Sequence, residues 1–134
     1  MSRLFQIKIQ IKRTKVNDLV DIGSQSNLIY EVVEKKLGLE TYEHPHPYPL
    51  GWVKKGIEIQ VTRRCKVNFG INSQYIDVFE VDVIPLDDFD VVFGSHYLYV
   101  RDAICMRREN QYKWVKHGIN YNIREHQCKT RVIM

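Results

Sequence analysis

The residue in this sequence whose type and setting best suit chemistry is Asp21. An apolar segment, residues 16–20, leads into it, and Ile22, Gly23 and Ser24 follow. A carboxylate can serve as a general acid or a general base when it is held in a defined position. Acids also precede glycine in many ordinary turns, where the carboxylate only bonds its own backbone. The neighbouring elements must therefore decide between these two interpretations.

Two strands are expected before Asp21. Residues 5–11 alternate apolar and polar side chains, and this period of two predicts a half-buried strand. Thr14 and Lys15 supply a turn, and residues 16–20 predict a second strand. The acid therefore lies where a strand becomes a turn.

A short helix is expected after the acidic turn. Asn27 suits its N-cap, Glu31 can pair with Lys35, and Gly38 suits the C-terminal cap. Residues 44–49 follow, in which proline occupies alternate positions. Because proline lacks a backbone donor, we expect an extended connection there rather than a helix or a central strand.

β-Hairpins are predicted for most of the remaining chain. Residues 50–53 and 57–67 flank a basic tip that contains glycine, and residues 65–69 are expected to pair with residues 75–84. A later apolar run that ends at Gly94 predicts a strand buried on both faces. A helical turn over residues 96–100 and a last hairpin, residues 111–115 with 119–123, complete the pattern. The sum is a mainly β domain with barrel-like closure.

This order of elements resembles the retropepsin family, in particular the aspartic protease domain of plant gypsy-type long-terminal-repeat retrotransposons. The resemblance extends over roughly residues 5 to 123. The family's active-site motif is an apolar pair, then Asp, Thr or Ser, Gly, and Ala or Ser. Residues 19–24 match this motif at all but one position, and residues 25–29 and 37–39 also look like the plant retroelement sequences.

Two further features of the family have counterparts here. The flap corresponds to Gly51, Trp52, Val53, Lys54, Lys55 and Gly56, and the second hallmark, which crosses behind the catalytic loop, corresponds to Val92, Phe93 and Gly94.

The resemblance implies a closed acid protease barrel with one short helix after the active-site turn. Residues 1–123 would form this domain, with residues 124–134 as a C-terminal tail. It implies an aspartic endopeptidase that cuts an extended peptide or a polyprotein, with no metal and no organic cofactor. Because the chain has a single Asp-x-Gly motif, it also implies a homodimer in which each subunit contributes Asp21. Two carboxylates within hydrogen-bonding distance of each other cannot both ionise, so one of their pKa values rises above the usual value of about 3.9.

Ile22 departs from the family pattern. The hydroxyl of Thr or Ser at this position would bond across the dimer axis, and isoleucine has neither a donor nor an acceptor. Each backbone group that loses this partner lowers the stability by roughly 1–3 kcal/mol if it remains buried without a hydrogen bond to water. Isoleucine keeps the β-branched shape, so the fold should survive while dimer rigidity and the alignment of the carboxylates weaken.

Other residue clusters have simpler interpretations. His44 and His46 have metal-ligand spacing and Cys65 could join them, but no fourth ligand is evident and a solvated loop is favoured. We expect Cys105 to be a small buried residue and Cys128 a tail thiol, rather than nucleophiles. Paired arginines at 63–64 and 107–108 are expected to be exposed charges, and Trp52 and Trp114 to pack in the flap or the core.

Length and composition limit the remaining classes. A chain of 134 residues suits one domain, and its apolar and charged fractions, 44% and 27%, are those of a globular protein. The net charge of +4 is scattered, so nucleic-acid binding is not favoured. No apolar segment is long enough to span a membrane, and the odd number of cysteines favours reduced thiols, so we expect a cytoplasmic protein.

Two hypotheses for function follow. The first is a retropepsin-like aspartic endopeptidase that acts as a homodimer, weakened by Ile22. The second is a catalytically silent copy of the same fold that serves as a dimerisation or peptide-binding module, in which the flap holds an extended peptide by strand addition. A small basic nucleic-acid-binding barrel is a remote third, because stacking aromatic residues are not clustered.

Overall fold

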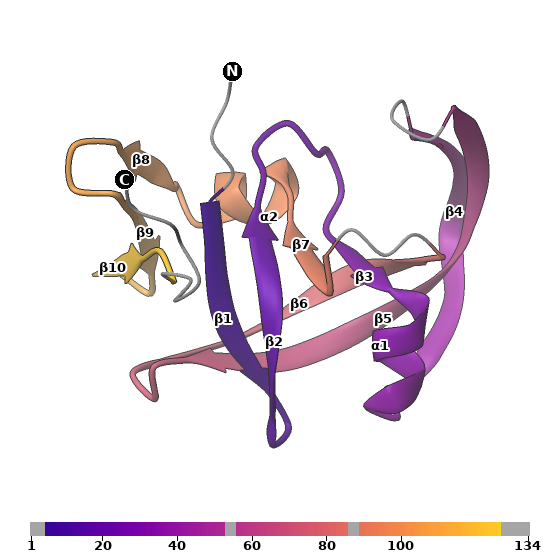
Figure 1. The fold of residues 1–134 in the computed structure, drawn as a ribbon, viewed down its shortest axis with the longest axis horizontal. Helices are drawn as coiled ribbons and strands as arrows, with labels where there is room; N and C mark the ends of the chain where they lie inside the picture. Colours follow the sequence, from indigo (N-terminus) through magenta and orange to yellow (C-terminus); the bar gives the residue numbers. More distant parts are fainter. Residues whose placement is uncertain (1–4, 53–55, 86–88, 127–134) are drawn as a thin grey trace, which may run out of the picture.

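The computed structural model describes residues 5–52, 56–85 and 89–126 (Figure 1). Its first two strands occur where the sequence pattern predicted them, but Lys12 and Arg13 form the turn between them, so the prediction of a turn at Thr14 and Lys15 was wrong. Strands β1 (Phe5–Ile11) and β2 (Thr14–Val20) form an antiparallel hairpin in which Phe5 lies opposite Val20. The odd-numbered residues of β1 are buried and face the core, as the alternation predicted.

Seven of the described strands form one large sheet, in the order β1-β2-β7-β3-β6-β5-β4. Both long hairpins are confirmed, and they share one long strand, β5. A single bridge, Gln10 opposite Gly70, also joins β1 to β5. The remaining strands of this sheet are β3 (Leu28–Tyr30), β4 (Thr41–Trp52), β5 (Ile57–Ile71), β6 (Tyr75–Ile84) and β7 (Val91–Phe93).

The helix after the acidic turn is shorter than expected. Helix α1 spans Glu31–Lys36, and its N-cap is Tyr30, so the prediction of an N-cap at Asn27 was wrong. Residues 28–30 instead pair with both β6 and β7 as β3, because their apolar side chains suit a buried strand as well as a helix. The C-terminal end is as predicted, since Gly38 has a φ of +64° and donates its amide to the carbonyl of Lys35.

The proline-rich segment is an edge strand, not a connection. Strand β4 pairs with β5 over Thr41–Glu43 and again over Tyr48–Trp52, with an irregular register between these stretches. Because β4 is the last strand of the sheet, the missing proline donors leave no central ladder incomplete. The segment is thus extended and neither a helix nor a central strand, as predicted, but it belongs to an edge strand that pairs with β5 on either side of residues 44–47.

The C-terminal part forms a small second sheet of three strands in the order β10-β9-β8. Helix α2 (Ser95–Val100) and the hairpin of β9 (Gln111–Lys116) and β10 (Ile119–Arg124) match the sequence pattern, whereas β8 (Ile104–Met106) was not predicted. Trp114 is fully buried in the main core, as expected. None of the helices in the described ranges is long and apolar enough to cross a membrane.

A buried polar cluster around Asp77 in β6 joins α2 to the main sheet. Tyr75 and Tyr97 donate hydrogen bonds to Oδ2 of Asp77, at 2.9 and 2.6 Å. Arg101 donates to both carboxylate oxygens, at 2.8 and 3.1 Å. Burial raises the pKa of Asp77, but the hydrogen bonds from Arg101 and Tyr97 outweigh it and lower the pKa to about 2. The cluster thus holds α2 against β6 through an ionised carboxylate.

Candidate active site

Asp21 follows the last residue of β2, at the point where β2 runs beside β7. The two strands are parallel, with Val20 opposite Phe93, and the Asp21 amide donates a 3.0 Å hydrogen bond to the Phe93 carbonyl. The Asp21 carboxylate is partly exposed, and its Oδ1 accepts the Gly23 amide at 2.9 Å. The backbone of the acid is thus fixed by a buried strand while its carboxylate faces outward, which is what a general acid or base requires.

The loop after Asp21 lies directly against Gly94. The Ser95 amide donates to the Ser24 carbonyl at 2.6 Å. A Cβ atom on Gly94 would lie 2.2 Å from the Ser26 carbonyl oxygen and 2.7 Å from that of Ser24, both backbone atoms. Only glycine fits this approach. The structure thus brings together the two segments singled out in the sequence, residues 21–24 and 92–94.

Asn27 connects the loop to two strands, a role that the sequence analysis missed. Its side-chain oxygen accepts the Gly94 amide at 2.9 Å, and its side-chain nitrogen donates to the Glu80 carbonyl at 3.2 Å. Its own carbonyl accepts the Asp82 amide at 2.9 Å. An asparagine shortly after an acidic turn was the available signal, but helix capping explained it equally well at the level of sequence.

Ile22 is one of several large apolar residues that the structure leaves exposed. Its side chain is 68% exposed, although it lies between the acid and Gly23. The isoleucine therefore contributes little to the core of its own chain. An apolar side chain in that position is available for contact with another molecule.

The flap residues lie at the hairpin between β4 and β5. Gly51 pairs with Glu58, Trp52 pairs with Ile57, and Gly56 has a φ of +62°. Val53, Lys54 and Lys55 lie outside the described residues. Figure 1 shows this end of the hairpin and the loop that follows β2 at the same end of the molecule.

The base of the flap contacts the active-site loop through Tyr48, which the sequence analysis did not single out. The Tyr48 hydroxyl lies 2.8 Å from Ser26 Oγ and 2.5 Å from Oδ2 of Asp82. Tyr48 and Leu50 also pack on a second apolar cluster, which includes Leu19 and Leu28 from the strands on either side of the loop. No local pattern around Tyr48 reveals these contacts, because its partners come from distant parts of the chain.

Comparison with known proteins agrees with this arrangement at the level of the fold. No family model matches the sequence, and no curated protein matches it. Among solved structures, the chain is similar to the crystal structure of the retroviral protease-like domain of Ddi1 from Leishmania major, with a TM-score of 0.68 and 13% sequence identity. The similarity covers 98% of this chain and 100% of that one.

The fold is retropepsin-like. Within this fold a second acid, Asp18, lies three residues before Asp21 in β2, and it is completely buried. Burial raises the pKa of Asp18 well above its usual value, and neither of its carboxylate oxygens has a hydrogen-bond partner among the described residues. Asp18 is therefore enclosed in the core, and Asp21 is the acid that faces outward.

The remaining candidate groups lie elsewhere in the retropepsin-like domain. No group of three or more His, Cys, Asp or Glu side chains suited to a metal occurs in the described part of the chain. Burial raises the pKa of Cys65 to about 12, so this thiol stays protonated. Cys105 is exposed, which corrects the expectation that it is buried, because β8 lies at the edge of the small sheet. Cys128 lies outside the described residues.

The arginine pair in β5 also differs from expectation. Arg64 is only partly exposed, and its Nε donates to Oδ1 of the buried Asp82 at 3.0 Å. Arg63 contacts the carboxylates of Glu31 and Glu34 in α1, at 3.2 and 3.3 Å. Sequence reasoning treated both as solvated charges because their acidic partners are distant in the chain.

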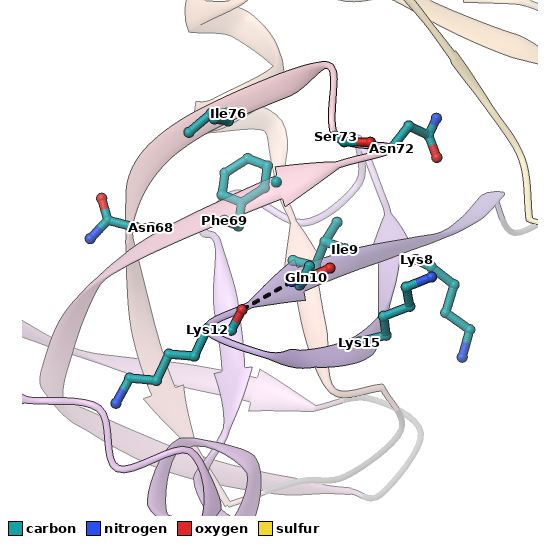
Figure 2. Close-up of a pocket in the computed structure, with 11 residues that line it drawn as sticks. Lys8, Ile9, Gln10, Lys12, Lys15, Asn68, Phe69, Asn72, Ser73 and Ile76 are labelled. Carbon is teal, nitrogen blue, oxygen red and sulfur yellow. Dashed lines mark hydrogen bonds between the residues drawn. The ribbon is translucent and has the colours of Figure 1, made fainter.

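A hollow of about 460 Å³ opens between β1 and the β5–β6 hairpin (Figure 2). Its lining includes Lys8, Lys12, Lys15, Asn68 and Phe69. None of the residues near Asp21 described above lines it. The hollow is therefore separate from the candidate active site.

Proposed function

We propose that this chain is the aspartic endopeptidase domain of a retroelement polyprotein and acts as a homodimer. The observation that supports this best is the Asp21 loop, whose backbone is bonded to β7 and closely apposed to Gly94 while the carboxylate stays accessible. A fold alone does not specify an activity, so the proposal depends on this site rather than on similarity.

In the proposed dimer, Asp21 of each subunit faces the other across the two-fold axis. One carboxylate accepts a proton from the attacking water, and the other, protonated, donates to the carbonyl oxygen of the scissile peptide. The exposed Ile22 would lie at this axis, where an apolar side chain becomes buried on dimerisation. The flap hairpin would cover an extended peptide.

Further structural and cellular expectations belong to this proposal. The large sheet closes into a barrel, for which the Gln10–Gly70 bridge between β1 and β5 is the support. Residues 1–123 form the domain and residues 124–134 a tail. The substrate is a polyprotein in the cytoplasm, no cofactor takes part, and neither a membrane nor nucleic acid is a partner.

A second candidate function is supported by Ile22 itself. Without a hydroxyl at this position the two loops lack a polar link across the axis, and catalysis is sensitive to small misplacements of reacting groups. The same fold without activity would serve as a dimerisation or peptide-binding module, with the flap strands pairing to an extended peptide.

Cleavage of a peptide library at acidic to mildly acidic pH separates these functions. The native chain, Ile22→Thr and Asp21→Asn are compared with and without an aspartic protease inhibitor, and sedimentation reports their dimerisation. Asp102→Asn, an exposed acid in the turn after α2, is the matched control. We expect Ile22→Thr to raise kcat/KM about tenfold, because it restores a hydrogen bond at each loop, and Asp21→Asn to abolish cleavage.

The outcomes differ for the two candidates. Dimers of the native chain and of Ile22→Thr that are both inert would reject the peptidase and leave the binding module. Cleavage by Ile22→Thr alone would mean that the native chain has lost activity through this one substitution. Cleavage that persists in Asp21→Asn would remove Asp21 from the mechanism.

A further inference from the structure

Tyr48 is hydrogen-bonded to two elements beneath the flap at once. Its hydroxyl lies 2.5 Å from Oδ2 of Asp82 in β6 and 2.8 Å from Oγ of Ser26 in the active-site loop. A hydroxyl carries one proton and an ionised carboxylate only accepts, so Tyr48 donates to Asp82. The Ser26 hydroxyl then donates to the Tyr48 oxygen. One phenol oxygen therefore connects β4, β6 and the loop that follows Asp21.

Asp82 is held in place from its other side. It is 3% exposed, and its Oδ1 accepts from Nε of Arg64 at 3.0 Å and lies 3.4 Å from Nε2 of His44. The His44 ring also packs edge-on against the Tyr48 ring, with centroids 5.4 Å apart. The Asp82 carboxylate, which accepts the Tyr48 proton, is thus held by Arg64 and by the packing of the His44 ring. Hydrogen bonds to carboxylates are shorter and stronger than those between neutral groups.

The Tyr48 proton remains in place over the physiological pH range. Burial raises the pKa of Tyr48 to about 12, and the hydrogen bond to Asp82 adds to this effect. The hydroxyl therefore donates throughout the range in which a peptidase of this class would act.

The position of Tyr48 in β4 explains how these hydrogen bonds can fix the base of the β4–β5 hairpin. It is the first residue of the stretch that pairs with β5 up to Trp52, and the register is irregular just before it. As the edge strand, β4 has only β5 as a ladder neighbour. The hairpin that carries the flap can therefore rise or tilt with β5 unless something fixes its base. The bond to Ser26 fixes the base to the loop, because the Ser26 carbonyl itself lies against Gly94.

We propose that Tyr48 is a positioning residue that attaches the base of the β4–β5 hairpin to the active-site loop and to β6 through its hydrogen bonds to Ser26 and Asp82. The inference rests on the proposed peptidase function where it concerns substrate, since a fixed flap matters for catalysis only if a peptide is held beneath it. Its structural part, the attachment of the hairpin to the active-site loop, does not depend on activity.

Amide hydrogen exchange on Tyr48→Phe tests the structural part. This substitution keeps the ring and removes only the hydroxyl. We expect exchange at residues 50–52 and 57–59 to accelerate about tenfold, which corresponds to about 1.4 kcal/mol, relative to residues 66–70 and 76–80 in the other hairpin. Uniform acceleration in both hairpins would indicate loss of global stability and would overturn the proposal.

The chain offers a matched control in Tyr42, which lies in the same strand. Its hydroxyl also bonds a carboxylate, Oε2 of Glu80 at 2.9 Å, but its side chain has no hydrogen bond to the loop. Tyr42→Phe should leave flap exchange within about twofold of the native rate. Equal acceleration in both variants would overturn the proposal, because the loss of any hydroxyl on β4 would then suffice.

Ser26 provides a second test and a conservative rescue. Ser26→Ala removes the link to the loop and leaves the Tyr48–Asp82 bond, so it should accelerate flap exchange in the same direction. Ser26→Thr keeps a hydroxyl and should restore exchange toward the native rate. A flap that is unchanged in Ser26→Ala would show that the loop plays no part and would overturn the proposal.

Peptide cleavage by the same variants tests the link to substrate. Tyr48→Phe is introduced into the native chain or into Ile22→Thr, whichever cleaves peptides. It should raise KM about tenfold and change kcat less, because a loosened flap weakens peptide binding. An unchanged KM would overturn the positioning role. If neither background cleaves, the proposed peptidase function fails, while the exchange measurements still decide the structural part.

Discussion

The amide of Gly94 donates a 2.9 Å hydrogen bond to the side-chain oxygen of Asn27, and this bond joins the two segments of the candidate active site. Both residues lie beside the loop that carries Asp21, yet they are 67 residues apart in the sequence. The opposite end of the Asn27 amide bonds β6 through the Glu80 carbonyl. One side chain therefore fixes the active-site loop to two strands.

Replacing Asn27 with alanine should strongly destabilise the domain. The substitution leaves the buried Gly94 amide without this partner, at roughly 1–3 kcal/mol, and also removes the part-buried hydrogen bond to the Glu80 carbonyl. We expect the free energy of unfolding, measured with urea, to fall by about 3 kcal/mol. Asn122→Ala, at an exposed position of β10, should change it by less than about 0.5 kcal/mol. Equal losses for both variants would contradict the role assigned to Asn27.

Gly94→Ala should be tolerated even less well. Its Cβ would approach the Ser26 carbonyl oxygen to 2.2 Å, so the loop or β7 must shift. We expect a loss of about 3 kcal/mol or more in urea unfolding. Gly51→Ala is the matched control, because a Cβ there meets no atom of the described residues within 4 Å. A native-like stability of Gly94→Ala would show that the loop can move away freely.

Asp18→Asn should change how stability depends on pH. Because burial raises the pKa of Asp18 in the native state, the native chain keeps this proton at pH values where the unfolded chain has lost it. Stability must then fall as pH rises above about 4, by up to about 1.4 kcal/mol per pH unit, until the native carboxyl ionises. Asparagine cannot ionise, so the variant gains stability relative to the native chain as pH rises above about 4. Urea unfolding across pH checks this, and parallel curves would contradict it.

Asp77→Asn should have the opposite effect on the pH dependence of stability. The native-state pKa of Asp77 is about 2, below its usual 3.8, so this group stabilises the native state above about pH 4 and stops doing so as pH falls through 2. The difference corresponds to about 2 kcal/mol. The native chain should therefore lose stability between pH 4 and pH 2, and Asp77→Asn should remove that part of the loss. Thermal unfolding in acid measures it, and an identical acid-induced loss in both chains would refute the assignment.

Local sequence patterns determined much of the architecture. The alternation in residues 5–11 predicted β1 because a strand with one buried face requires a period of two. Gly38 marked the end of α1 because few other residues adopt its positive φ. The positions of Asp21 after β2 and of Gly94 after β7 were predicted as well, since an acid at a strand end and a glycine after a buried strand are local features.

The same local reasoning failed where a long-range contact decided the outcome. Residues 28–30 have apolar spacing that suits a helix, but pairing with β6 and β7 on both sides made them a strand. The segment of alternating prolines formed β4 because an edge strand needs donors on only one side.

The sequence by itself determined that one acid, Asp21, would be carried on a turn of a mainly β domain. Only the tertiary structure decided what surrounds that acid: Gly94 against the Ser26 carbonyl, Asn27 between two strands, and Tyr48 bonded to Ser26 and Asp82. The physical reason is that turns and periodicities arise from neighbouring residues, whereas close approach and hydrogen bonding between distant segments depend on how the strands pair.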